Sequence, residues 1–318
     1  MWGALWSVYI VWGSTYLAIR VADRTLPPFL MAGARFIVAG ALMYGWSVWR
    51  GETRYQRPTG PNWGAAAIVG GALLLGGNGG VVWAEQHIDS GLTALIVATV
   101  PLWMALMDRA FFGQRLSWTA VVGLVLGFAG LTLLVQGGSG KHTSVAGIVA
   151  VVFAAFAWAA GSLYSRRAPL HSKPLVATGM EMLAGGALLG VAGLLAGEAN
   201  DVHLAHVGLT PALSWGYLVV FGSLVGFTAY VWLLRVAPTA LVGTYAYVNP
   251  VIAVFLGWLL LHEAIGWRTF VGGGVIVLGV LLIVTARQLP RARGEPAAGQ
   301  PAQEGVPAED AAARTRTA

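Results

Sequence analysis

The sequence predicts an all-α integral membrane protein with ten transmembrane helices in two inverted five-helix repeats. Three observations support this fold class: the composition, a series of long uncharged segments, and an internal repeat. Of the 318 residues, 57% are hydrophobic and only 10% are charged. Ordinary globular domains contain about 25% charged residues. The composition therefore argues against a soluble enzyme.

Uncharged segments of membrane-spanning length recur along the whole chain. A segment of at least 18 residues rich in apolar side chains is typical of a membrane-spanning helix. Residues 29–49 and 174–197 are each interrupted by one charge, Arg35 and Glu181, and Trp2 to Ile19 forms a first span. The other spans are predicted in the uncharged runs 58–84, 90–107, 116–140, 142–165, 202–234, 236–262 and 269–286.

The net charge of +6 follows the predicted topology. With a cytoplasmic N-terminus, most basic residues fall in inside loops, and the outside loops hold only Arg20, Arg24, Lys141 and Arg268. Basic loops face the cytoplasm in membrane proteins. We therefore expect both termini to be cytoplasmic, and we expect the lipid bilayer, rather than nucleic acid, as the chain's surroundings.

No motif for a metal, a cofactor or catalysis stands out. The chain has no cysteine, so disulfides and cysteine-bound metals are excluded. His203 and His206 lack the further ligands of a metal site, and the glycines of Gly76 to Gly80 are not followed by the Lys-Ser/Thr of a phosphate-binding loop. We expect no cofactor, no metal and no enzyme activity, and an energy source other than bound nucleotide.

An internal repeat divides the chain into two halves. An offset of 146 residues pairs Pro28 with Pro174, and an offset of 149 pairs Pro101 with Pro250. The boundaries predicted are 1–137 for the first repeat, 143–286 for the second, and 287–318 for a disordered cytoplasmic tail rich in Pro, Ala, Gly, Glu and Gln. Five spans per repeat, an odd number, would invert the second half. Such architectures place a binding site between the halves and favour a carrier.

Three segments carry a resemblance to a known family: WGSTYLAIRVADRTLPPFLMAGARF, GNGGVVWAEQHIDSGLTALIVATVPLW and TYAYVNPVIAVFLG. With the two five-span halves, they resemble the EamA-domain carriers of the drug/metabolite transporter superfamily, and within it the YedA type of bacterial inner-membrane permease. The likeness covers about residues 2 to 286. It implies ten helices in two inverted halves and transport of small metabolites, amino acids or drugs, often outward, across the bacterial cytoplasmic membrane.

Charged and amide side chains within spans are the first candidates for substrate binding. Arg35 lies roughly 9 Å below the predicted outer end of its span, and Asn78 is at a similar depth, so Arg35, Asn78 and Glu85 are predicted to line an outward-facing vestibule. Glu181 is the repeat equivalent of Arg35. Charged residues within spans usually face the bundle interior or a water-filled cavity. Structural roles stay open for each: a snorkelling or paired Arg35, and carboxylates of Glu85 and Glu181 solvated near the surface.

The matched prolines are candidates for gating. Pro101 and Pro250 are predicted in the middle of their spans, where each would remove a backbone donor and free the carbonyl four residues earlier, that of Val97 or Ala246. We expect two kinked helices that move during transport, with a static kink as the alternative.

Aromatic and amide side chains complete the predicted binding site. Tyr245, Tyr247 and Asn249 precede the second proline, and Trp12 and Tyr16 lie in the first span. Apolar and aromatic walls with few polar anchors suit a small amphipathic molecule. Packing without substrate contact is the alternative for each.

The sequence thus predicts a secondary-active transporter, an exporter of a small molecule by alternating access, acting as a monomer or homodimer. Proton coupling through Glu85 or Glu181 is left open. The alternative is a membrane-embedded enzyme acting on a lipid or lipid-linked substrate, against which the missing catalytic constellation of His, Asp and Ser argues.

Overall fold

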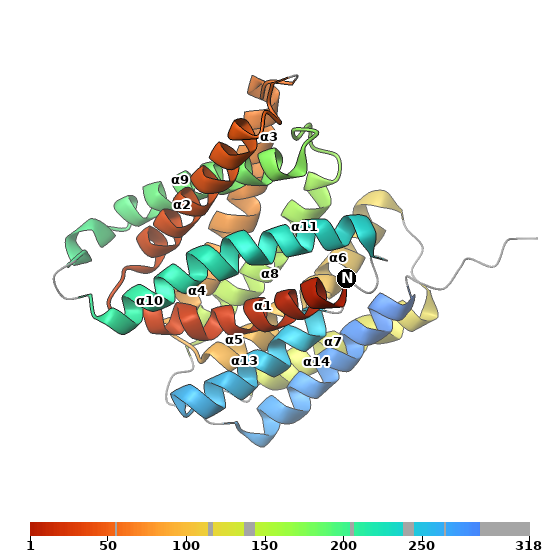
Figure 1. Ribbon diagram of the computed structural model, residues 1–318. Coiled ribbons are helices and arrows are strands. Elements are labelled where there is room, and N and C mark those ends of the chain that lie inside the picture. The colour runs from red at the N-terminus through yellow and green to blue at the C-terminus, as the bar shows by residue number, and fades with distance from the viewer. Residues whose placement is uncertain are drawn as a thin grey trace, which may run out of the picture. The chain divides into compact units, whose positions relative to one another are not determined.

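The computed structural model is helical throughout its described residues, which are 1–54, 56–113, 117–136, 144–203, 207–237, 245–263 and 265–286, and no β-strand occurs among them. The coarse prediction of an all-α protein is therefore confirmed (Figure 1). The predicted tail at 287–318 and the junction between the predicted repeats at 138–142 lie outside the described residues.

The helices of the two halves follow one another in the same order. Those of the first half are α1 (Trp2–Ala22), α2 (Pro28–Trp49), α3 (Gly60–Gly70), η1 (Gly71–Gly79), α4 (Gly80–Glu85), α5 (Ser90–Val97), α6 (Val100–Phe112) and α7 (Trp118–Gln136). Those of the second half are α8 (Val145–Ser165), α9 (Pro174–Leu195), η2 (Glu198–Asp201), α10 (Leu209–Tyr217), η4 (Leu218–Val225), α11 (Gly226–Val236), α13 (Tyr245–Leu261) and α14 (Trp267–Ala286).

Seven helical stretches within the described residues are long and apolar enough to cross a membrane, and shorter apolar helices cover Trp118–Leu133 and Val248–Leu261. The continuous stretches Gly60–Glu85 and Leu209–Tyr230 are each built from several consecutive helices. Large apolar side chains lie exposed along these helices, among them Leu42, Val125 and Phe153. Such extensive apolar exposure is expected where lipid, rather than water, surrounds the helices.

Glycines let α2 and α9 approach closely, and the two helices lie side by side in Figure 1. A Cβ atom at Gly33 would lie 2.9 Å from the backbone nitrogen of Gly190, and one at Gly40 would lie 2.9 Å from that of Leu183. Because the contact position on α9 moves backward as that on α2 moves forward, the helices run antiparallel. Small residues one or two turns apart are how membrane helices bring their backbones together.

The pair α7 and α14 repeats this arrangement. A Cβ atom at Gly123 would lie 2.7 Å from the carbonyl oxygen of Gly279, and one at Gly130 would lie 2.7 Å from that of Gly272. These helices also run antiparallel. They occupy corresponding places in the two halves, as do α2 and α9, so each pair joins a helix to its counterpart.

Two π-helical segments interrupt corresponding spans of the two halves. η1 follows α3 in the first half, and η4 follows α10 in the second. A π-helix carries an extra residue per turn relative to an α-helix, is rare, and frequently occurs at functional sites. The glycine pairs Gly76/Gly80 and Gly222/Gly226 fall in or directly after these segments.

The two prolines differ in their local structure. Pro250 lies inside α13, as predicted. Pro101 does not kink a continuous helix, because α5 ends at Val97 and α6 begins at Val100, which places Pro101 in the first turn of α6. Thr99 closes the end of α5 by donating to the Ile96 carbonyl from its backbone nitrogen at 3.0 Å and from its hydroxyl at 2.6 Å. A proline is well tolerated in a first turn, where its missing N–H has no intrahelical partner.

Candidate functional site

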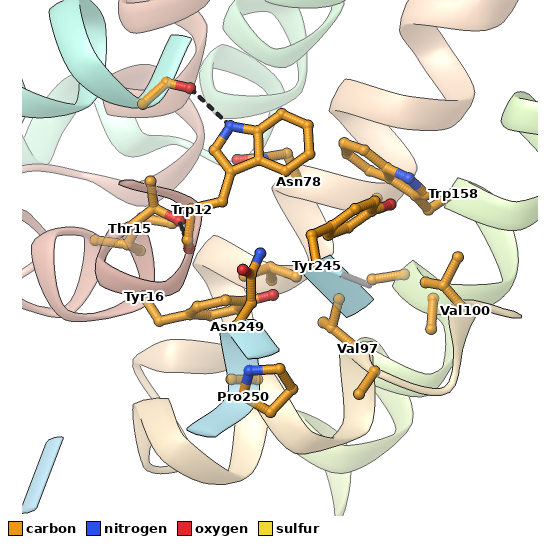
Figure 2. A pocket seen from close by; sticks show the side chains of 18 of the residues that line it. Trp12, Thr15, Tyr16, Asn78, Val97, Val100, Trp158, Tyr245, Asn249 and Pro250 are labelled. Carbon is orange, nitrogen blue, oxygen red and sulfur yellow. Dashed lines mark hydrogen bonds between the residues drawn. The ribbon is translucent and has the colours of Figure 1, made fainter. Parts of the chain in front are cut away.

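A central pocket lies where helices of both halves meet, and Figure 2 shows it from close by. Its cavity volume is about 110 Å³. Helices α1, α2, α5, α8 and α13 contribute, together with both π-helical segments. Its lining residues are Trp12, Thr15, Tyr16, Ile19, Arg35, Gly77, Asn78, Val81, Ala94, Val97, Ala98, Val100, Ala154, Ala155, Trp158, Gly222, Phe227, Tyr245, Asn249 and Pro250.

Aromatic rings from three helices form one wall of this pocket. The ring centroid of Trp12 on α1 lies 5.4 Å from that of Phe227 on α11 and 5.4 Å from that of Tyr245 on α13, both in edge-to-face geometry. Tyr230 lies behind this pair, 5.2 Å from Trp12. Edge-to-face pairs contribute about 0.5–1.5 kcal/mol beyond area burial. The wall is therefore held by mutual packing of its rings.

Glycines of the second π-helical region make room for Trp12. Its indole nitrogen donates to the Gly222 carbonyl at 3.2 Å, the bond dashed in Figure 2. A Cβ atom at Gly226 would overlap the same indole nitrogen. Only glycine at position 226 leaves space for the ring in this position, so the small-residue pattern here serves the pocket as well as helix packing.

Arg35 is the only charged residue that lines the pocket. It is 3% exposed. Its Nε donates to the hydroxyl of Ser223 at 2.9 Å, and its guanidinium carbon lies 4.7 Å from the ring centroid of Phe36. Its Nη1 is buried and has no hydrogen-bond partner. A buried donor left unpaired costs about 1–3 kcal/mol, so the pocket holds an unmet demand for an acceptor.

Asn78 supplies a complementary group from η1. Its side-chain oxygen is also buried without a hydrogen-bond partner, and it lines the same pocket as Arg35. The sequence predicted that Arg35 and Asn78 lie at a similar depth, and the structure brings both to one cavity. The cavity thus offers one unpaired donor and one unpaired acceptor between apolar and aromatic walls.

Asn249 connects α13 to α1. In the amide orientation that satisfies its hydrogen bonds, its nitrogen donates to the carbonyl oxygens of Tyr9 at 3.2 Å and Tyr245 at 3.3 Å. Pro250, the next residue, lines the pocket. On the opposite side, Val97, Ala98 and Val100 line the pocket at the break between α5 and α6. Both proline regions therefore border the cavity, although Pro101 itself is not among its lining residues.

The remaining predicted site residues lie elsewhere. Glu85 is fully buried, so the alternative of a carboxylate in water is wrong for it, yet it does not line the pocket. Glu181 does not line the pocket either, and its helix packs there against Gly70 of α3. The side chain of Tyr247 lies outside the part of the structure that is described. Trp12, Tyr16 and Tyr245 line the pocket as predicted positions.

Two carboxylates close the end of the molecule at which α1 ends and α2 begins, here called the α1–α2 end. Glu198 accepts hydrogen bonds from the backbone nitrogens of Phe29 at 3.2 Å and Leu30 at 2.9 Å, at the start of α2. Glu263 accepts from the backbone nitrogen of Ser90 at 3.0 Å, from its hydroxyl at 2.7 Å, and from Gly91 at 3.1 Å, at the start of α5. Each satisfies the free N–H groups of a first turn.

Several residues of the site were not singled out from the sequence. Ser223, which receives the Arg35 bond, is the only hydroxyl residue in Leu218–Val225, and a lone polar residue in an apolar span was the available signal. Asp23, buried near Glu85, looked like an ordinary loop residue. Nothing in the sequence indicated that Phe227 would face Trp12.

The model of the EamA-like transporter family matches residues 1–136 and again residues 145–285. The chain belongs to this family. An inner membrane transporter of Escherichia coli (strain K12), YedA, is 39% identical over 292 residues, which cover 91% of this chain and 92% of YedA. The family relationship predicted from the sequence motifs is thereby confirmed.

More distant EamA relatives and a solved structure agree with this assignment. A protein of Escherichia coli (strain K12) named "Probable amino-acid metabolite efflux pump" is 26% identical over 87% of this chain and 92% of its own length. A crystal structure that is 22% identical covers 89% of this chain and 97% of its own, with a TM-score of 0.62, and shows a similar fold.

Proposed function

We propose that this EamA protein is a secondary-active exporter of small metabolites, amino acids or drugs, which it binds in the central pocket and carries by alternating access. The observation that carries this proposal is the pairing of Arg35 Nη1 with Asn78 Oδ1 in one cavity, both buried and both without a partner. Buried polar groups are nearly always hydrogen-bonded in native structures. A bound molecule would supply both partners.

The walls of the pocket define the kind of molecule that fits. The guanidinium of Arg35 favours an acceptor with negative charge, because charge-assisted hydrogen bonds are about twice as strong as neutral ones. Trp12, Tyr16 and Trp158 offer aromatic faces to an apolar body. A cavity of about 110 Å³ has room for a small molecule, and apolar walls with few polar anchors are typical of such sites.

The antiparallel pairing of equivalent helices supports alternating access. α2 runs against α9, and α7 against α14, each helix facing its counterpart in the other half. That arrangement is what two inverted repeats would give, and inverted repeats that rock around a midplane site are common among secondary transporters. With the loop charges, we infer ten spans, both termini in the cytoplasm and a bacterial cytoplasmic membrane.

A reconstituted system tests the proposal. Purified protein in proteoliposomes should accumulate or exchange at least one compound from a panel of amino acids, nucleosides and drugs. The same compound should raise the unfolding temperature of the protein in detergent, because binding to the folded state stabilises it. Absence of both responses across the panel, together with chemical conversion of a lipid, would instead favour the enzyme.

The prolines that border the pocket give a first prediction. Pro101→Ala and Pro250→Ala should each lower the turnover of the transported compound by about tenfold, which corresponds to about 1.4 kcal/mol on the rate-limiting step, while its affinity changes little. The physical reason is that alanine restores a continuous helix where the moving halves bend. Initial rates in proteoliposomes measure the effect. Pro61→Ala, at the exposed start of α3, is the matched control, and unchanged turnover in both pocket variants would refute a gating role.

A further inference from the structure

Two buried carboxylates, Asp23 and Glu85, lie between the central pocket and the α1–α2 end. Glu85 is one helical turn beyond Val81 on α4, and Asp23 is one turn beyond Ile19 at the end of α1. Val81 and Ile19 both line the pocket. Glu85 is fully buried. None of the four carboxylate oxygens of the pair has a hydrogen-bond partner, and all four are shielded from solvent.

The charged groups around the pair do not compensate two negative charges. Asp23, Arg20 and Glu263 act electrostatically on Glu85, and Arg20 and Glu198 act on Asp23. Arg20 is the only cation in this set, and its Nη1 donates to the carbonyl of Ile88 at 3.4 Å. The other ionisable neighbour is the phenol of Tyr16, which also lines the pocket.

Satisfied and unsatisfied carboxylates occur side by side here. Glu198 and Glu263 accept five hydrogen bonds between them from helix N-termini and from Ser90. Donors of this kind stabilise an ionised carboxylate. Asp23 and Glu85 have none. Burying an ionised carboxylate without donors costs so much that such a group takes up a proton instead.

We propose that Asp23 and Glu85 together hold one exchangeable proton, in a site between the central pocket and the α1–α2 end. One proton leaves a single negative charge opposite the single positive charge of Arg20. It also gives the pair one O–H donor, which the second carboxylate can accept. Burial raises the pKa of Asp23 well above its ordinary value, Glu198 acts in the same direction, and Arg20 opposes both.

A proton fits this site better than a metal cation. A hard cation such as Ca²⁺ takes six to eight oxygen ligands. The nearby carboxylates of Glu198 and Glu263 are already occupied by backbone donors, which leaves the oxygens of Asp23 and Glu85. No group of three or more His, Asp or Glu side chains in the described residues is arranged to hold a metal.

The position of the pair gives the proton a role, which rests on the proposed transport function. The loop charges place the α1–α2 end outside the cell. Opening of that end would expose Asp23 and Glu85 to the outside solution and allow the proton to exchange there, whereas closure buries it one turn from the pocket. The proton is then the coupling ion for export.

Infrared spectroscopy tests the proton directly and needs no substrate. Full-length protein in lipid at neutral pH should show a protonated-carboxyl band that shifts in D₂O, because the proton is exchangeable. In the double variant Asp23→Asn with Glu85→Gln, the band should fall at least twofold. The matched control is Glu198→Gln with Glu263→Gln, which removes two hydrogen-bonded carboxylates from the same end and should keep the band.

Three outcomes would overturn the proposal. The wild-type protein could lack the band between about pH 5 and pH 8, the double variant could retain it at full intensity, or Glu181→Gln alone could remove it, which would assign the proton to α9. Asparagine and glutamine mimic the neutral acids in shape, and the wild-type titration decides the question even without the variants. A transport assay that fails for every compound would overturn the proposed function and leave the band unchanged.

Discussion

Replacement of Arg35 by alanine is expected to abolish substrate binding and transport in an otherwise folded protein. The guanidinium is the only charge that lines the pocket, and its Nη1 has no partner within the protein. A hydrogen bond to a charged group contributes about 1.5–3 kcal/mol, so affinity should fall roughly 10- to 150-fold. Dissociation constants from thermal-shift titrations and initial rates in proteoliposomes measure the loss.

Two further variants separate recognition from packing at this position. Arg35→Lys keeps the charge but loses the planar donor set that reaches Ser223 and the cavity together, so it should recover only part of the affinity. Arg24→Ala removes an exposed arginine from the turn after α1 and should behave as wild type. If monodisperse Arg35→Ala protein transports at the wild-type rate, Arg35 has a packing role only.

Replacement of Gly279 by leucine is expected to prevent stable folding. Even a Cβ atom there would lie 2.6 Å from the Gly123 carbonyl and 2.7 Å from the Gly127 nitrogen. Both are backbone atoms of α7, so the helices must separate. Overpacking costs about 1–3 kcal/mol and occasionally more, and here it acts along the whole α7–α14 contact. Thermal unfolding and size-exclusion profiles in detergent measure the effect.

Gly274 offers the matched control on the same helix. A Cβ atom there would have no neighbour within 4 Å, so Gly274→Leu should fold with an unfolding temperature close to that of wild type. Equal stability of the two leucine variants would show that α7 and α14 do not pack through Gly279.

The span pattern and the matched helices could be predicted from the sequence because both depend on local composition. Runs without charge predict helices of membrane length, and the repeat offset that pairs Pro28 with Pro174 also pairs α2 with α9. The co-location of Arg35 and Asn78 followed from simple depth counting at about 1.5 Å per residue. These predictions needed no knowledge of how the helices cross.

The features that depend on helix crossing could not be predicted. An α-helical count cannot indicate where η1 and η4 take up their extra residues, and that change sets which faces of Gly77 and Gly222 meet the pocket. The break at Thr99 depends on bonds to Ile96 that the sequence does not reveal. Asp23 and Glu85 are 62 positions apart, and only the packing of α1 against α4 makes them neighbours.

The glycine contacts between equivalent helices make the two halves dependent on each other. α2 finds its closest neighbour in α9, and α7 finds its own in α14. Each half therefore contributes one side of both contacts and covers neither. If residues 1–137 were produced alone, α2 and α7 would present uncovered grooves of bare backbone to the lipid. The second half thus acts as the folding template of the first, and a damaging substitution in either half is felt by both.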